Sequence, residues 1–221
     1  MNIKLPAIRI PQMNLLFHKV KKRVFSTLST ASDIALFTGI VLIGGLGSSW
    51  YMVSAGSALS THSLGPWVAW TSEGRADADP YTRAHFARHG RLNLSSDIAA
   101  TYTATYDQDG IRLHSSCEYR IAGPDLDANW WSISVFDHKG RLIPNSANRY
   151  AYTRDTVALR PTGDFMITLA RDARPGNWLP TAGAGRLAIV LQLLEPSNAF
   201  DPESTSNTAA LLPDIEKVSC R

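Results

Sequence analysis

Tryptophan, asparagine, arginine and aspartate residues in the second half of the chain are the types best suited to binding a ligand. The pair Trp130-Trp131 lies in one β-type run, and a later loop, residues 174–180, reads RPGNWLP. Successive strand side chains point to opposite faces, so one tryptophan of the pair faces the core and the other faces outward. An outward tryptophan beside Trp178 can stack on a sugar ring or anchor a protein partner. We therefore predict a binding site formed by Trp131, Asp137, Arg149, Asn177 and Trp178.

These residues also have a structural interpretation, which stays open. The aromatic side chains would close one end of the fold, and Asn177 would hydrogen-bond the loop backbone. Several arginines are candidates for lining an anionic site: Arg75, Arg83, Arg120, Arg149 and Arg160. However, the segment from residue 54 onward holds 14 Arg and only 2 Lys, so arginine at any one position also fits a bias in composition.

Two histidines have the spacing of metal ligands. His85 and His89 are four residues apart, so a helix places both on one face. Catalytic zinc sites use a third protein ligand, and the glutamate that follows the first histidine of the metalloprotease motif is missing here. Arg83 and Arg88 flank the pair and would repel a cation. We expect a polar helix face and no metal site.

Four aspartates resemble ligands for calcium, which prefers hard oxygen atoms. Asp77 and Asp79 alternate along the chain, as do Asp107 and Asp109. The run DQDG at 107–110 lacks the remaining ligands of a twelve-residue calcium loop. Turn formation explains this run better, and helix capping explains Asp79.

Nucleophilic side chains occur without the groups that would activate them. The run His114-Ser-Ser-Cys117 lies in a β-type segment, where neighbouring side chains point to opposite faces. The chain contains no Gly-x-Ser-x-Gly elbow, and its glycine-rich run at 44–47 lies in an apolar segment rather than a phosphate-binding loop. The catalytic residues are therefore unknown, and no cofactor is expected.

The charge distribution divides the chain into unlike parts. Residues 1–33 carry +5, whereas the whole chain carries +3, so the remaining 188 residues carry −2. No Asp, Glu, Lys or Arg occurs from residue 34 to residue 72. The twenty apolar or small residues 34–53 would span about 30 Å as a helix, the thickness of a bilayer core. We predict a transmembrane helix over 34–53, with Trp50 and Tyr51 at its outer interface.

The positive-inside rule assigns the topology of this helix. A cytoplasmic basic arm covers residues 1–33, and the C-terminal bulk is exported. A cleaved signal peptide is the rival interpretation, because small residues follow at 54–60, but the apolar run exceeds the usual length of such a peptide. Within the arm, residues 13–25 form either a basic interfacial helix or a simple topology signal. The pairs Ala35/Gly39 and Gly44/Ser48 have the spacing of helix–helix packing motifs in membranes.

The exported part begins with a predicted Ser/Gly linker over 54–71, and a periplasmic domain follows over 72–221. Asp79-Pro80 is typical of a helix start, so we expect a helix that ends at Gly90, and a second short helix near Ser95 or Ser96. From residue 101 the apolar period changes to two. The predicted strands cover 101–107, 111–121, 131–137, 141–144, 149–153, 156–160, 164–170 and 186–194.

These strands are separated by turn signals and by no helix-length connection. Parallel pairing would need such crossovers, so the pattern favours an antiparallel β-sandwich or jelly-roll-like domain with one or two short helices. The two cysteines, Cys117 and Cys220, both follow the predicted span, in the compartment where disulfides persist. Their pairing would close a loop of about a hundred residues and contribute about 4–5 kcal/mol. Two free buried thiols are the alternative.

Several separated motifs resemble the bacterial domain-of-unknown-function 1214 family, and in particular its short, membrane-anchored branch. The motifs lie at residues 74–94, 117–123, 130–145, 148–153, 176–180 and 187–196. The resemblance implies a β-sandwich, jelly-roll-like domain in the periplasm behind one transmembrane segment. It also implies that Cys117 and Cys220 belong to the pattern of this branch, which supports their pairing. The family has no settled activity.

We therefore expect a single-pass protein of the bacterial inner membrane. The leading hypothesis is that its periplasmic β-sandwich binds an envelope protein partner or a ligand without catalysis. The alternatives are a periplasmic hydrolase or carbohydrate-active domain, and an accessory subunit of a larger membrane complex. The bilayer is an expected partner. The small net charge gives no reason to expect nucleic acid.

Overall fold

The structure is a computed structural model that describes residues 13–56, 59–89, 94–96, 98–197, 200 and 205–221. It divides into two compact units, Met1–Tyr51 and Met52–Arg221. Each unit is described by itself below.

Helix α1 (Met13–Ala55) forms the described part of the first unit and continues to the start of the second. Its segment Thr30–Ala55 is long and apolar enough to cross a membrane, and none of its most apolar window is buried. Large hydrophobic side chains such as Leu36, Phe37 and Leu46 are exposed along this segment. The helix therefore includes the predicted span 34–53, and the basic segment 13–25 continues into the same helix.

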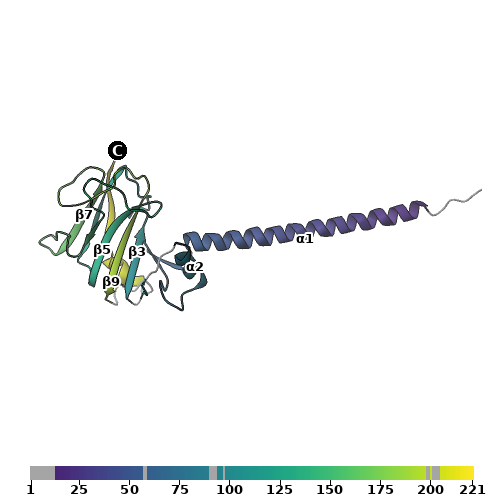
Figure 1. The fold of residues 1–221 in the computed structure, drawn as a ribbon, viewed down its shortest axis with the longest axis horizontal. Helices are drawn as coiled ribbons and strands as arrows, with labels where there is room; N and C mark the ends of the chain where they lie inside the picture. The colour runs from purple at the N-terminus through teal and green to yellow at the C-terminus, as the bar shows by residue number, and fades with distance from the viewer. Residues whose placement is uncertain (1–12, 57–58, 90–93, 97, 198–199, 201–204) are drawn as a thin grey trace, which may run out of the picture. The chain divides into compact units, whose positions relative to one another are not determined.

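The second unit contains a six-stranded sheet, in which all neighbouring strands are antiparallel. The strands, in spatial order, are β1 (Thr61–Leu64), β2 (Trp67–Trp70), β3 (Ala99–Ala104), β9 (Leu187–Pro196), β5 (Ala128–Asp137) and β6 (Ala151–Thr153). Figure 1 shows β3, β9 and β5 side by side at the centre of this sheet.

A four-stranded sheet forms the second layer. Its strands, in spatial order, are β10 (Asp214–Cys220), β4 (Cys117–Pro124), β7 (Asp164–Ala170) and β8 (Asn177–Pro180). Strands β10, β4 and β7 are antiparallel, whereas β8 runs parallel to β7. A short loop over 171–176 returns the chain along β7, so this one parallel pair needs no helical crossover.

The core lies between the two sheets, because strand side chains alternate between an inner and an outer face. The largest fully buried side chains include Trp67, Tyr102, Trp131, Tyr119 and Phe165. The Trp131 ring on β5 meets the Phe165 ring on β7 with centroids 4.9 Å apart, which joins the two layers. The mainly-β, sandwich-like fold is thus confirmed, and the finer jelly-roll description stays a prediction.

Two short helices accompany the sheets. Helix α2 (Pro80–His89) begins as predicted: the Asp79 carboxylate accepts hydrogen bonds from the backbone N–H groups of Tyr81 (2.8 Å) and Thr82 (3.1 Å). The predicted stop at Gly90 lies outside the described residues. Helix α3 (Thr205–Leu211) was not expected, because residues 195–221 resemble an irregular tail in the sequence.

The structure differs from the sequence predictions in several segments. The strand expected over 111–121 begins only at Cys117, and residues 141–144 make a single bridge, from Leu142 to Phe136, in place of a strand. Residues 61–70, expected within the linker, form the hairpin β1–β2, because the buried Leu64 and Trp67 flank the two-residue loop Gly65-Pro66. The described residues near Ser95 and Ser96 form a turn rather than a second helix. Residues 156–160 make a single bridge, from Leu159 to Phe165, in place of a strand.

Candidate functional site

Of the predicted site residues, Trp131 lies in the hydrophobic core. Its side chain has no exposed surface, and its indole N–H donates to a carboxylate oxygen of Asp125 at 3.1 Å. Trp130, the other member of the pair, is half-buried. The alternation predicted for this pair is therefore correct, and Trp131 is its inward member, which leaves it no surface for a ligand.

Asp137 ends β5 and closes the turn that follows. Its Oδ1 accepts from the backbone N–H groups of Lys139 (2.8 Å) and Arg141 (2.9 Å). Its Oδ2 accepts two bonds from the Arg141 guanidinium, at 2.9 and 2.7 Å. The Arg141 N–H, its guanidinium and the Lys139 N–H together lower the pKa of Asp137 to about 2 despite partial burial. All of these bonds belong to the turn.

Asn177 is a buried amide at the start of β8. Its Oδ1 accepts from the Ala158 N–H at 2.8 Å, and its Nδ2 donates to the carbonyls of Ala158 (2.9 Å) and Met166 (3.0 Å). The amide thus satisfies three backbone groups that would otherwise be unpaired. This bonding matches the structural interpretation of Asn177.

Arg149 and Trp178 are brought together by a third residue, Tyr152. The Arg149 guanidinium lies 5.9 Å from the centre of the Trp178 ring and 5.7 Å from that of Tyr152, and it donates to the Trp178 carbonyl at 3.2 Å. The Trp178 N–H donates to the Tyr152 hydroxyl at 3.0 Å. We call these three residues the arginine–aromatic edge.

The arginine–aromatic edge connects the two sheets. Tyr152 lies on β6 and Trp178 on β8, which are the outer strands of the six-stranded and four-stranded sheets. The indole N–H of Trp178 also donates to the Ala170 carbonyl at 3.0 Å. The exposed Arg149 covers this junction, so the edge combines a structural role with an accessible cation above two aromatic rings.

The histidines of α2 are occupied by contacts within the second unit. The His85 ring stacks on Trp70 with centroids 3.9 Å apart, and its Nδ1 lies 2.8 Å from the Val53 carbonyl. The Nδ1 atom of His89 lies 2.8 Å from the His85 carbonyl. Across the described ranges, no three His, Cys, Asp or Glu residues are grouped so that they could hold a metal ion.

The aspartates considered for calcium have other partners. Asp77 forms an ion pair with Arg75 at 2.9 Å, and the hydrogen bond from that side chain lowers the pKa of Asp77. Asp79 caps α2. The Oδ1 of Asp107 accepts from the N–H groups of Asp109 (3.1 Å) and Ile111 (2.7 Å), which closes the predicted turn.

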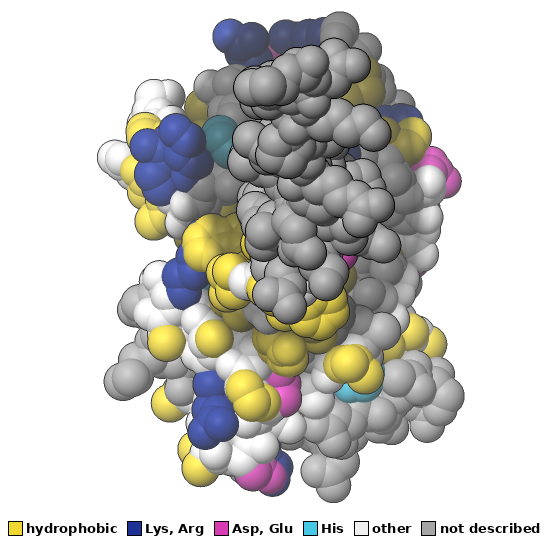
Figure 2. Space-filling model, turned by 90° about the vertical axis from the view of Figure 1, so that its right-hand side faces the viewer, with side chains coloured by type: hydrophobic (Ala, Val, Ile, Leu, Met, Phe, Trp, Pro, Cys, Tyr) yellow, Lys and Arg dark blue, Asp and Glu magenta, His cyan; other side chains and the backbone are white. Residues whose placement is uncertain are grey.

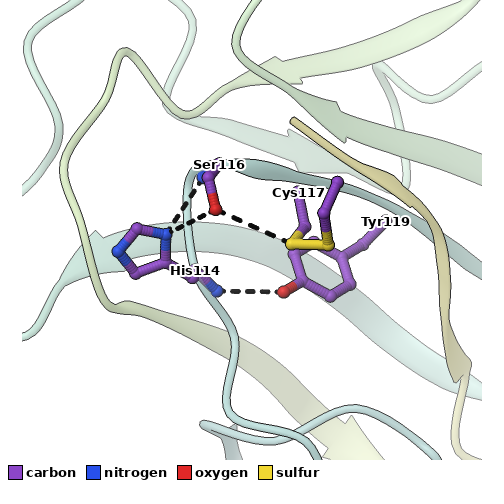
Figure 3. The surroundings of a disulfide bond; sticks show 5 residues. His114, Ser116, Cys117 and Tyr119 are labelled. Atoms are coloured by element: carbon purple, nitrogen blue, oxygen red, sulfur yellow. Dashed lines mark hydrogen bonds between the residues drawn. A yellow bond between two sulfur atoms is a disulfide. The ribbon is translucent and has the colours of Figure 1, made fainter.

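Cys117 and Cys220 form the predicted disulfide, which links the first residue of β4 to the last residue of β10. Figure 3 shows its surroundings. The Ser116 hydroxyl lies 3.7 Å from the Cys117 sulfur and 2.8 Å from Nδ1 of His114, and the His114 N–H donates to the Tyr119 hydroxyl at 3.0 Å. Burial is the main cause that raises the pKa of the Tyr119 hydroxyl, which is therefore a neutral partner here.

A pocket of about 290 Å³ adjoins the disulfide. It lies where the start of β4 meets the ends of β7 and β10, and three arginines, Arg171, Arg174 and Arg221, line it. Sequence reasoning did not select these arginines. A signal was present, however, because pairing Cys117 with Cys220 places Arg221 beside Ser116 and Glu118 at the start of β4.

Comparison with known proteins gives a family match over part of the chain and a shared fold. Residues 98–198 match the family model described as a protein of unknown function, DUF1214. No curated protein matches the chain. Four chains of solved structures match.

Two of the solved structures come from named bacteria. The VPA0106 protein of Vibrio parahaemolyticus is 18% identical with a TM-score of 0.52, and the match covers 65% of this chain and 36% of that one. An uncharacterized protein of Burkholderia cenocepacia is 14% identical with a TM-score of 0.42, and the match covers 79% and 41%. The chain thus spans about two fifths of the length of these structures. The first likeness shows a shared fold.

Proposed function

Residues 98–198 match the DUF1214 family model, and from that premise we propose that the chain is a single-pass protein of the bacterial inner membrane whose periplasmic domain binds an envelope protein partner. In this proposal the N-terminus is cytoplasmic, and the arginine–aromatic edge is the binding surface. The contact between Arg149 and Trp178 carries the proposal, because it is an exposed cation held over aromatic rings at the margin of both sheets.

The anchoring half of the proposal is supported by charge and by the disulfide. The apolar segment of α1 follows a basic cluster, Lys19–Arg23, and no charged residue occurs between residues 34 and 72. This order fits a cytoplasmic N-terminus. The Cys117–Cys220 bond is typical of an oxidising compartment such as the periplasm.

The surface character also bears on the type of partner. Figure 2 shows one face of the molecule, on which Lys and Arg side chains form separate groups among hydrophobic and other side chains. At the arginine–aromatic edge, the Arg149 guanidinium occupies a face of the Trp178 ring. A sugar would need that face for stacking, whereas a protein partner can use the arginine and the tryptophan together, since both are common in interface hot spots.

The hydrolase alternative has less support. It requires two titratable groups that share a pocket near Trp131 and Asp137, with carboxylates about 5–9 Å apart for glycoside chemistry. Trp131 is enclosed in the core, and both carboxylate oxygens of Asp137 are bonded to the turn. Binding without catalysis is therefore the function that the described geometry favours.

Topology is tested with reporters in intact cells. We expect an alkaline phosphatase fused after Arg221 to be active, because export is needed for its own disulfides to form. Fusion of the same enzyme after residue 30 should be inactive. An inactive fusion after Arg221 would overturn the anchoring half of the proposal.

Partner binding is tested by site-specific crosslinking. A photoreactive phenylalanine analogue at position 149 should give one discrete adduct in intact cells, and a matched analogue at position 160 should not. Arg160 is the control because it is also an exposed arginine, and it pairs with Asp164 across a turn. Adducts of the same size from both positions, or from neither, would contradict a binding surface at this edge.

A further inference from the structure

We propose that the pocket beside the disulfide binds a small anion that carries a carboxylate or phosphate group. The pocket shares no residue with the arginine–aromatic edge. Anion binding in the pocket therefore does not depend on a protein partner at that edge. Its lining residues are polar or charged except for the cystine and Ala170.

The arginines give the pocket its preference for anions. Arg174 pairs with Glu118 at 2.7 Å, and Arg221 pairs with Asp172. Arg171 has no ion pair with any residue in the described part of the chain. Counted over side chains, the lining therefore holds one positive charge more than Glu118 and Asp172 balance. A guanidinium matches the planar fork of a carboxylate or the oxygens of a phosphate.

The geometry of the ion pairs strengthens this preference. The side chains of Arg174 and Glu118 are 37% and 19% exposed, so their charges are partly shielded from water. The hydrogen bond that Arg174 donates to the Glu118 carboxylate raises the pKa of Arg174. A bound anion would share the outer N–H groups of the arginines instead of displacing the carboxylates.

Hydroxyl groups supply the neutral donors of the pocket. Ser115 is 5% exposed and lines the pocket, and its Oγ accepts a bond from the Gly185 N–H at 2.8 Å. Since that bond uses a lone pair of the oxygen, the O–H remains to donate to a ligand. Ser116 and Ser219 add further hydroxyl groups to the lining.

The disulfide holds one wall of the site. Arg221 directly follows Cys220, and its backbone N–H donates to the Ser116 carbonyl at 3.0 Å. The Cys117–Cys220 bond keeps the end of β10 against β4 and so positions Arg221 at the pocket. Anion affinity is therefore expected to depend on the oxidised state of the two cysteines.

The experiment is calorimetric titration of the full chain in a nonionic detergent, with inorganic phosphate and succinate as probes. We expect saturable binding of at least one probe at concentrations below about 10 mM. Replacing the unpaired guanidinium with Arg171→Ala should weaken binding about tenfold, because a charge-assisted contact is lost. Arg171→Lys should weaken it less, and the matched control Arg160→Ala should leave it unchanged.

The disulfide is tested by the double variant Cys117→Ser/Cys220→Ser, whose melting temperature shows whether the sandwich still folds. If it folds, its affinity should fall about threefold or more, because Arg221 is less firmly held. Binding of phosphate alone or of succinate alone identifies the ligand class and supports the site. The proposal is overturned if neither probe binds, or if Arg171→Ala binds as tightly as the unmodified protein.

Discussion

Two turns of this domain share the same hydrogen-bonding design, and the residue that follows the glycine differs between them in its ability to donate a hydrogen bond. The first is Asp107-Gln-Asp-Gly110 followed by Ile111, and the second is Asp137-His-Lys-Gly140 followed by Arg141. In each turn the aspartate Oδ1 accepts from the N–H groups two and four residues later. In each turn the glycine N–H donates to the aspartate carbonyl at 3.0 Å.

The difference lies at the second carboxylate oxygen. Oδ2 of Asp137 accepts two bonds from the Arg141 guanidinium, whereas Ile111, at the equivalent position, has nothing to donate. Oδ2 of Asp107 is buried and has no hydrogen-bond partner among the residues that the structure describes. The two turns thus distinguish how much the backbone N–H groups and how much the arginine stabilise the aspartate carboxylate.

The comparison teaches how to interpret Asp137 as a candidate site residue. A lowered carboxyl pKa near aromatic residues often marks a functional site. Here the same backbone cradle recurs at Asp107, far along the chain from the predicted site, so the cradle is turn chemistry. The pKa of about 2 at Asp137 follows from this cradle together with Arg141.

The largest expected effect comes from removing each carboxylate. Asp107→Ala deprives two backbone N–H groups of their acceptor, which should lower the free energy of unfolding by about 2 kcal/mol. Asp137→Ala also removes the two hydrogen bonds with the Arg141 guanidinium, so its free energy of unfolding should fall further. Urea denaturation followed by tryptophan fluorescence measures both variants. A smaller loss at Asp137 than at Asp107 would break the comparison.

The glycines should respond alike in the two turns. Gly110 and Gly140 have φ values of 75° and 71°, in the left-handed region that other residues avoid. An alanine at either position should cost about 1–2 kcal/mol. Around Gly110 the space for a Cβ is open, so the cost there is conformational. Thermal denaturation of Gly110→Ala and Gly140→Ala should give similar losses, and a marked difference would show that the turns are not equivalent.

Asparagine at each aspartate should distinguish the turns. Asp137→Asn loses the charge that binds Arg141 and should be destabilising. Asp107→Asn keeps the Oδ1 acceptor and exchanges one unpartnered buried group, the second carboxylate oxygen, for another, the amide NH2, so it should be less destabilising than Asp137→Asn. Equal losses for the two asparagine variants, measured by denaturation at neutral pH, would contradict the role assigned to Arg141.

The smallest expected effect is the change with pH in the stability difference between the unmodified protein and Asp137→Asn. The folded pKa of Asp137, about 2, lies below its ordinary value of 3.8. Its contribution to stability is therefore complete above about pH 4 and is lost as the pH falls through about 2. Melting temperatures of the unmodified protein and the asparagine variant should converge between pH 4 and pH 2. A constant gap over this range would show that another group is responsible.

Features set by neighbouring residues were predictable from the sequence. Both aspartate–glycine turns, the Asp79 cap and the strand at 164–170 match the structure. Each depends on contacts within a few residues, which propensity and periodicity describe. The disulfide joins distant residues, but the chain contains only two cysteines, so only one pairing within the chain was possible.

Features set by distant contacts were not predictable. The hairpin at 61–70 resembles a linker because the segment 54–66 is rich in serine and glycine, although Leu64 and Trp67 are buried. Arg149 contacts Trp178 because β6 and β8 are edge strands of the two sheets. The order of strands in a sheet cannot be inferred from the alternation of side chains along one strand. The pocket arginines were missed for the same reason, since the pocket needs the ends of three strands.

The pairing of β4 with β10 has a consequence for how the domain folds during export. Cys117 precedes its partner by 103 residues, and β4 has only β7 on its other side. Until β10 has been synthesised and translocated, β4 presents an open edge of unpaired backbone groups. The newly exported chain is therefore exposed to mispairing and aggregation during this interval, and oxidation of the cysteines ends it by capping that edge covalently.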